Sequence, residues 1–484
     1  MTTGSINTIK LVLVYRVKRN TFAPSKMTIF TMKLKCIFSS MLMLTVVSAT
    51  QAFAGAKQES VPALSPKSDS LTVVSDGHQV NEKKSRLVIG GYGEAVMTRT
   101  FYTDSWQRYT HADLYKDDKG YGRFDLPHVV IFLGYDFGRG WSMGTEIEFE
   151  HGGTESAIEI EEEETGEYES EIERGGEVAL EQFWIQKSWK PSLNLRMGHV
   201  VVPVGLTNSQ HNPTEFFGTF RPEGESTIIP CTWHETGISF WGMAKGWRYE
   251  IQFLAGLDAD RFNNKNWVKG GAGSPYEFKI ANSYATAMRV DNYSVKGLRI
   301  GLSGYVGNSA HNTLKRKSYK DLNGTVGIGA LDFNYDDHNV IARGSFLYGH
   351  LTNSAAIAET NRRLKGFGIT SPTNIGSDAM AAGVEVGYDF FSLNDKLRSN
   401  NQKFYLFARY DYYDSMFRMG KTDKGQQLVD EQQWGRHKVS VGINYKPMDC
   451  IVIKAEYTHR LFKPQFNDEP AVSIGIAYSG LFKK

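Results

Sequence analysis

Long apolar runs, proline and cysteine are scarce in this chain of 484 residues. A helix that crosses a membrane needs about 18 or more consecutive apolar residues. The longest apolar stretch extends only from Cys36 to Ala49 and is interrupted by Ser39 and Ser40, so a membrane-spanning helix is not expected. Only 14 prolines accompany 48 glycines, 24 tyrosines and 28 phenylalanines. This balance favours strands joined by turns over helices.

The stretch from Cys36 to Ala49 has the features of a secretory signal peptide. Two lysines precede it, and the small-residue pattern Ala52-Phe53-Ala54 follows it as a cleavage site. Because a signal peptide lies close to its initiator methionine, we expect translation to start at Met27 or Met32. Residues 1–54 are then an upstream extension plus a signal peptide, and they contribute nothing to the fold.

Without residues 1–54 the chain is acidic. After their removal 48 basic and 53 acidic residues remain, so the formal net charge changes from +2 to −5. A basic surface is thus not supported, and no nucleic-acid partner is expected. Residues 55–85 are rich in Ser, Lys, Asp and Pro and poor in large apolar residues. Such a segment cannot bury enough surface to fold, and we interpret it as a disordered periplasmic lead-in.

From Arg86 onward, segments of about ten residues alternate apolar and polar side chains. A period of two is typical of strands. In the clearest segment, Ile451 to Arg460, one face carries Ile453 and Tyr457 and the other carries charged residues. The predicted strands cover residues 86–101, 123–137, 142–153, 178–189, 193–205, 236–244, 247–257, 284–293, 298–310, 324–337, 340–353, 378–393, 403–416, 435–447, 451–462 and 470–482.

The connections between these sixteen strands are alternately long and short. An even strand count with this alternation is typical of outer-membrane barrels, and a sheet in lipid must close on itself to leave no unpaired edge. Sixteen strands enclose an aqueous channel. The sequence therefore predicts an all-β fold over residues 86–484: a transmembrane antiparallel β-barrel with short periplasmic turns and long extracellular loops. We expect it in the lipid of the outer membrane of a Gram-negative bacterium.

A short motif suggests a family. The segment Gly198-His-Val-Val-Val-Pro-Val-Gly-Leu206 is followed by a polar stretch and then by Trp233-His-Glu-Thr-Gly-Ile238. This arrangement resembles the corresponding hairpin of the phosphate-selective porin O and P family. The resemblance implies a sixteen-stranded barrel, often a homotrimer, whose third long loop folds inward and whose anion path carries cationic residues. That cationic ladder is not matched residue by residue here, so phosphate selectivity is not carried over.

Strand parity predicts which charged side chains face the lumen, because charges are costly on the lipid face. The pore-lining residues predicted in this way are Arg196, Arg248, Arg289, Arg299, Arg343, Arg409, Glu146 and Glu148. Further inward-facing charges are Lys438, Lys454, Arg460, Glu150, Glu250, Asp291, Glu385, Asp411 and Glu456. Many of them are expected to pair across neighbouring strands.

Two of the long loops carry candidate sites. The third, residues 206–235, contains His211, Arg221, Glu223 and Glu225; folded into the lumen it would constrict the pore, and otherwise it packs against neighbouring loops outside. The second contains ten Glu and no Lys or Arg between Glu155 and Glu173. That segment could bind a divalent cation, form an acidic mouth that repels anions, or be a solvated surface loop, and we favour the last.

These features predict a water-filled channel for passive diffusion of small hydrophilic solutes or ions, without a cofactor or a metal centre. Neither a Gly-x-Ser-x-Gly nor a His-Glu-x-x-His motif occurs, and an enzyme is not expected. The alternative is a barrel that acts as an adhesin or structural protein through its loops. Cys231 and Cys450 fall at opposite ends of the predicted barrel, so we expect two free thiols. The identity of the solute is not specified.

Overall fold

The computed structural model describes residues 86–152, 158–162, 168–172, 177–273, 279–313, 317–364, 370–422 and 424–483. The predicted signal peptide, both candidate start sites and the lead-in at 55–85 lie outside the described residues. The same holds for parts of the Glu-rich segment.

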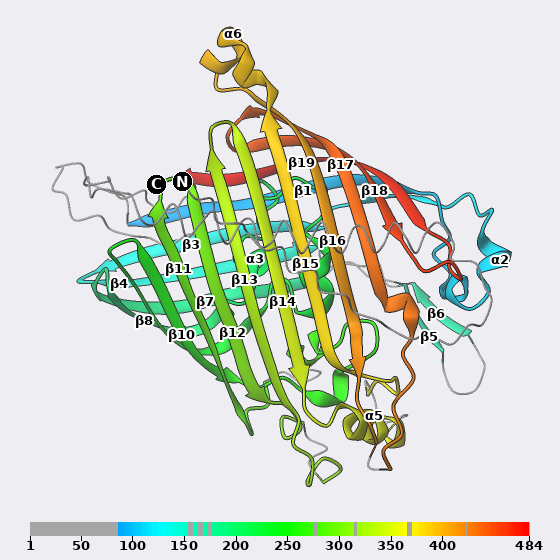
Figure 1. The fold of residues 1–484 in the computed structure, drawn as a ribbon. Helices are drawn as coiled ribbons and strands as arrows, with labels where there is room; N and C mark the ends of the chain where they lie inside the picture. Colours follow the sequence, from blue (N-terminus) through cyan, green and yellow to red (C-terminus); the bar gives the residue numbers. More distant parts are fainter. Residues whose placement is uncertain are drawn as a thin grey trace, which may run out of the picture. The chain divides into compact units, whose positions relative to one another are not determined.

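The described strands form a closed antiparallel barrel (Figure 1). Their bounds are β1 (Leu87–Thr100), β2 (Gly122–Asp125), β3 (His128–Gly138), β4 (Trp141–Glu150), β5 (Ile158–Glu162), β6 (Tyr168–Ile172), β7 (Glu177–Lys190), β8 (Leu193–Val201), β9 (His234–Ala244), β10 (Trp247–Ala255), β11 (Tyr284–Val295), β12 (Leu298–Asn308), β13 (Thr325–Asp337), β14 (Val340–Leu351), β15 (Gly376–Asp389), β16 (Lys403–Met419), β17 (Gly435–Met448), β18 (Ile451–Leu461) and β19 (Glu469–Lys483). Each wall strand pairs with the next, and β1 pairs with both β3 and β19, which closes the ring.

When β2 and β3 are counted as one strand, because both pair with β1, the ring has sixteen strands, as predicted. The predicted strand 123–137 is interrupted at Leu126 and Pro127, because proline has no N–H to donate to the ladder. The strand predicted to reach residue 205 ends at Val201, two residues before Pro203. The Glu-rich segment, predicted as a loop, contains the hairpin of β5 and β6.

The two ends of the barrel differ in their connections. At the short-turn end, Arg139–Gly140 and Lys245–Gly246 join neighbouring strands with positive φ at all four residues, as tight hairpins require. The long-loop end carries most of the helical turns. The helices are η1 (Trp106–Tyr109), α2 (Ala112–Tyr115), α3 (Leu206–Ser209), α4 (Glu223–Ile228), η2 (Ala259–Arg261), η3 (Lys269–Ala272), α5 (Ser354–Arg363), η4 (Phe390–Leu393), α6 (Asp395–Ser399) and η5 (Gln432–Trp434). In the described part of the chain, no helix has the length and apolar character to cross a membrane.

Opposite faces of each strand differ in chemistry. On β18, Ile453 and Tyr457 point outward and are 42% and 41% exposed, whereas Lys454 and Glu456 point inward and are 2% and 7% exposed. Exposed tryptophans lie near the short-turn ends of several strands; they are Trp141, Trp189 and Trp247. An apolar outer face bordered by aromatic side chains matches the surface that a bilayer requires.

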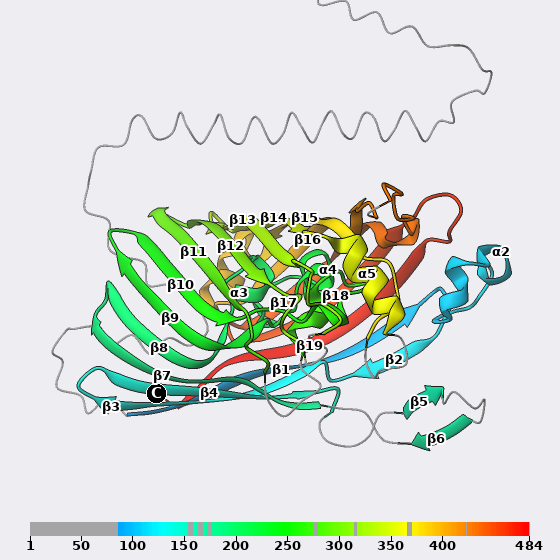
Figure 2. The same cartoon turned by 90° about the horizontal axis from the view of Figure 1, so that it is seen from below.

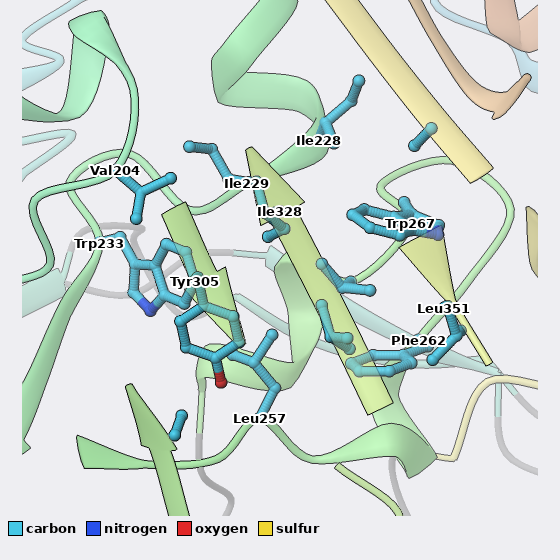
Figure 3. Packing of buried hydrophobic residues seen from close by; sticks show 14 of the residues in the cluster. Val204, Ile228, Ile229, Trp233, Leu257, Phe262, Trp267, Tyr305, Ile328 and Leu351 are labelled. Carbon is cyan, nitrogen blue, oxygen red and sulfur yellow. The ribbon is translucent and has the colours of Figure 1, made fainter. Parts of the chain in front are cut away.

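Part of the interior is apolar. One buried cluster extends from the end of β8 through α4 and the 254–268 segment to the inner faces of β11–β15, and Figure 3 shows Ile228, Ile229 and Trp267 packed within it. Small inward-facing residues make room for these side chains. A Cβ on Gly349, for example, would lie 2.2 Å from the Trp267 ring. The lumen near β11–β15 is therefore filled by packed side chains, which strand parity did not predict.

Candidate functional site

The third long loop crosses the inside of the barrel. We call residues 202–233 the lumen loop; it connects β8 to β9 and contains α3 and α4, which Figure 2 shows within the ring of strands. Pro203 and Gly205 turn the chain inward. Gly205 has φ of 81°, and a Cβ there would lie 2.9 Å from a Glu225 carboxylate oxygen. The motif valines have almost no exposed surface and anchor this turn; they are Val200, Val202 and Val204.

The return of the lumen loop to the wall is fixed by Trp233. Its backbone N–H donates to the Asn208 side-chain oxygen at 2.5 Å, and its ring packs against Tyr305 with centroids 4.9 Å apart (Figure 3). The Asn208 amide group in turn donates to the carbonyl of Val202. Both halves of the sequence motif thus serve to attach the two ends of the lumen loop.

The middle of the lumen loop is held by the opposite wall. Lys454 of β18 donates to the carbonyls of Phe216 and Gly218 at 2.9 and 2.6 Å. Glu456 accepts from the backbone N–H and the hydroxyl of Thr219 at 3.0 and 2.6 Å. Lys446 of β17 reaches the carbonyl of Thr214 at 3.2 Å. These contacts join the loop to strands far later in the sequence.

Glu223, at the start of α4, meets the same wall. Lys438 and Arg460 each lie 2.8 Å from its carboxylate, and the Tyr413 hydroxyl donates at 2.6 Å. Burial alone would raise the pKa of Glu223, but Arg460 and Lys438 outweigh it and hold the pKa well below its ordinary value. We call Lys438, Lys446, Lys454 and Arg460 the basic wall.

A second wall, on β4 and β7, is acidic. We call Glu146, Glu148 and Glu181 the acidic wall; all three are buried. The β4–β7 register shifts between Glu146 and Ile147, and this bulge turns both Glu181 and Gln182 inward, an effect typical of bulges.

The lumen loop places its basic groups beside the acidic wall. Arg221 lies 3.8 Å from Glu148 and donates to the Tyr92 hydroxyl at 3.3 Å. The His211 ring lies 3.6 Å from Glu181. Burial lowers the pKa of His211 to about 4, although Glu181 acts in the opposite direction, so the ring is neutral at neutral pH and Arg221 carries the positive charge.

The remaining predicted arginines on β11 and β12 belong to a closed network. Arg289 contacts Asp332 at 2.9 Å and Asp291 at 2.8 Å, and it donates to the carbonyl of Gly205 at 3.0 Å. Arg299 lies 2.8 Å from both aspartates. This network neutralises its own charges and supports the base of the lumen loop.

A small cavity of about 20 Å³ separates the lumen loop from β14–β16. Arg343 and Arg409 line it together with Glu385, which lies 2.8 Å from Arg343 and 3.2 Å from Arg409. On the loop side, Glu215 contributes to the lining. A cavity of this size holds about one water molecule. Arg343 and Arg409 thus face free volume beside the loop.

Other predicted residues have structural surroundings. Arg196 lies over the Trp184 ring at 4.5 Å, and Arg248 pairs with Glu250 at 2.7 Å. Glu225 accepts from the backbone N–H groups of Leu206 and Thr207 at 3.2 and 2.7 Å and therefore supports the loop from within. Cys231 and Cys450 are both free, in the lumen loop and in the β17–β18 turn.

Sequence reasoning did not find two contributors to this region. Glu181 was missed because simple alternation assigns Glu181 and Gln182 to opposite faces, and only the bulge brings both inward. Lys446 has the same parity as Lys438 on the predicted strand 435–447, but alternation does not show that it reaches the lumen loop. A run of polar residues at consecutive positions in a strand is the sequence signal that could have revealed the bulge.

No family model matches this chain. An uncharacterized protein of Aquifex aeolicus (strain VF5) is 24% identical over 399 residues, which cover 81% of this chain and 79% of that protein. Among solved structures, OmpF of Salmonella typhi in complex with daunomycin is 11% identical with a TM-score of 0.47, covering 81% of this chain and 97% of that one. An anion-selective porin from Comamonas acidovorans is 11% identical with a TM-score of 0.45, covering 81% and 99%. The assignment of the fold rests on the strand pairings described above.

Proposed function

We propose that this protein is an outer-membrane porin that forms a narrow, water-filled channel for passive diffusion of small hydrophilic solutes or ions. The observation that carries the proposal is the lumen loop, which crosses a closed barrel and is held between an acidic and a basic wall. An apolar outer face suits lipid, and a charged inner face suits water and ions. The long-loop end then faces the outside of the cell and the short-turn end faces the periplasm.

Selectivity resides beside the lumen loop in this proposal. The cavity lined by Arg343, Arg409, Glu385 and Glu215 carries both charge signs, so strong selectivity for anions is not expected from it. The resemblance of the motif 198–206 to the phosphate-selective porin O and P family supports a porin and a homotrimer. The specific transport of phosphate is not part of the proposal.

Single-channel recording in planar lipid bilayers tests the proposal. The purified, folded chain should produce discrete conductance steps, and deleting about ten residues from Thr214 to Gly224 should raise the step size because the lumen loop no longer narrows the barrel. Deleting 113–118, which lies in an exposed loop between β1 and β2, is the matched control and should leave the step size unchanged.

Absence of conductance in both the wild type and the loop deletion, with correct insertion, would reject the channel. The filled interior near β11–β15 favours one alternative in that case, a barrel that displays its long loops as an adhesin or structural protein. Binding of folded protein to surfaces or matrix proteins, lost on trimming the outer loops, would then identify that function.

A further inference from the structure

A histidine and two carboxylates converge at the long-loop end of β3 and β4. His128, Glu148 and Glu150 each offer a ligand atom, and these atoms lie within 4.8 Å of one another. The strand register explains this convergence. His128 is directly opposite Glu150, and Glu148 is two residues further along the same inner face of β4. Side chains opposite and diagonal to one another on one face of a sheet are within mutual reach.

Glu94 of β1 fixes the orientation of the histidine. The His128 Nδ1 atom lies 2.7 Å from a Glu94 carboxylate oxygen. Because a carboxylate accepts hydrogen bonds, Nδ1 carries the proton and the Nε2 lone pair is available to a ligand. A carboxylate that holds one ring nitrogen while the other binds an ion is the usual support of a metal-bound histidine.

The surroundings of Glu148 give an independent indication that this cluster binds a ligand. Its side chain is 4% exposed, and its Oε1 atom is buried without a hydrogen-bond partner. The nearest cationic group, Arg221 Nη2, is 3.8 Å from this oxygen, which is beyond hydrogen-bond distance. A buried carboxylate oxygen without a hydrogen bond is costly, and a cation between it and its neighbours would remove that cost.

We infer that His128, Glu148 and Glu150 bind a first-row divalent transition-metal ion such as Zn²⁺, with Glu94 as the positioning residue. Imidazole nitrogen and carboxylate oxygen are both Zn²⁺ ligands, and three protein ligands leave a further position for water. Ca²⁺ and Mg²⁺ prefer oxygen ligands only. Ligand atoms around tetrahedral Zn²⁺ are about 3.4 Å apart, so small side-chain rotations close the site. Glu150, the last residue of β4, is partly exposed and gives ions access.

This site differs from the metal alternative that the sequence suggested. That alternative placed a divalent cation on the Glu-rich segment 155–173, whereas the inferred site uses the barrel wall and a histidine. The inference of a Zn²⁺ site also does not depend on whether the protein conducts ions, because Zn²⁺ binding is measured directly. A channel that fails to conduct could still bind the ion, and a conducting channel could fail to bind it.

The test titrates Zn²⁺ into the full chain without a polyhistidine tag, folded in detergent and stripped of metal with EDTA. Isothermal titration calorimetry should show one saturable site per chain. His128→Gln and Glu150→Gln should each weaken binding about a hundredfold or more, and Glu94→Gln should weaken it about ten- to a hundredfold. Co²⁺ should give a visible absorption band that is lost in the His128→Gln variant.

His199→Gln is the matched control. His199 and His234 form another close histidine pair, with ring nitrogens 2.5 Å apart. Replacing His199 should leave the Zn²⁺ affinity of the inferred site unchanged. A hundredfold excess of Ca²⁺ should not displace Zn²⁺. Glu150 lies at the end of β4, so we expect Glu150→Gln to fold even if His128→Gln does not. Circular dichroism checks the folding of both variants. No saturable Zn²⁺ binding, displacement by Ca²⁺, or unchanged affinity in folded Glu150→Gln would overturn the inference.

Discussion

The acidic and basic walls differ in how they hold the same loop. The basic wall bonds mainly to backbone carbonyls and to Glu223, so several direct hydrogen bonds anchor the loop there. The acidic wall contacts the loop through Arg221 and His211 at 3.6 to 3.8 Å, without direct hydrogen bonds between those pairs. Direct hydrogen bonds thus hold the loop against the basic wall, whereas longer electrostatic contacts act at the acidic wall.

One short segment carries this division. Arg221 faces the acidic wall and Glu223 faces the basic wall, and Pro222 between them precedes the first turn of α4. Proline is favoured where a helix begins because its φ is fixed and it lacks an N–H that would need a partner. The opposite charges of Arg221 and Glu223, on either side of the rigid Pro222, thus set the orientation of the loop in the lumen.

Exchanging the two charges should have the largest effect. In the double variant Arg221→Glu, Glu223→Arg, each wall meets a group of its own sign, and we expect a loss of more than about 4 kcal/mol from the seated loop. The loop should leave its position, become sensitive to protease and raise the single-channel conductance. Unchanged conductance and protease resistance would show that the charges do not orient the loop.

Neutralising Glu223 alone should have a smaller effect. Glu223→Gln leaves Lys438 and Arg460 without a carboxylate, and we expect about 2–3 kcal/mol of destabilisation in urea unfolding. Glu359→Gln is the control, because its contact with Arg363 on α5 is largely exposed and should contribute less than about 0.5 kcal/mol. Equal losses in the two variants would contradict a specific role for Glu223.

Removing the cavity arginines should change the ion selectivity. Arg343→Gln with Arg409→Gln leaves Glu385 and Glu215 as the charges of the cavity, so the reversal potential in asymmetric KCl should move toward cation preference. The change should shrink between 0.1 M and 1 M salt, as the screening length falls from about 10 to about 3 Å. Arg363→Gln, which changes an exposed side chain at the end of α5, should have no effect. A shift that is independent of salt would place the selective charges elsewhere.

The pH dependence of stability should show the smallest effect. Because the folded pKa of Glu223 is lowered, its contribution is fully present above the unfolded value of about 4.3 and is lost as the pH falls through the lowered folded value. Unfolding measured from pH 6 to pH 3 should therefore differ between the wild type and Glu223→Gln mainly at the upper end of this range. The difference should shrink once the pH falls below about 4.3; a difference that stays constant down to pH 3, or one that grows on acidification, would contradict the lowered folded pKa.

The alternation of apolar and polar residues was sufficient to predict the strands of the barrel but not the contacts among the side chains inside it. Alternation located β18 to within a residue at its C-terminal end, because one face meets lipid and the other does not. Alternation could not place the break at Pro127 or the bulge at Glu181, since each is a single residue that interrupts the period. Parity also assigned Arg289 and Arg343 to the same face without showing that one is enclosed by aspartates and the other lines a cavity. Those differences depend on neighbours around the ring, which a linear pattern does not specify.

The contacts between the lumen loop and β18 constrain the order of assembly. Lys454 and Gly218 are 236 positions apart in the chain, so the loop is made long before the strand that holds it. Loop closure over such a distance is slow compared with the formation of neighbouring hairpins. The middle of the loop therefore stays unattached to this wall until β18 takes its place in the sheet. When β19 pairs with β1, the two edges of the sheet join. The same step encloses the lumen loop within the barrel.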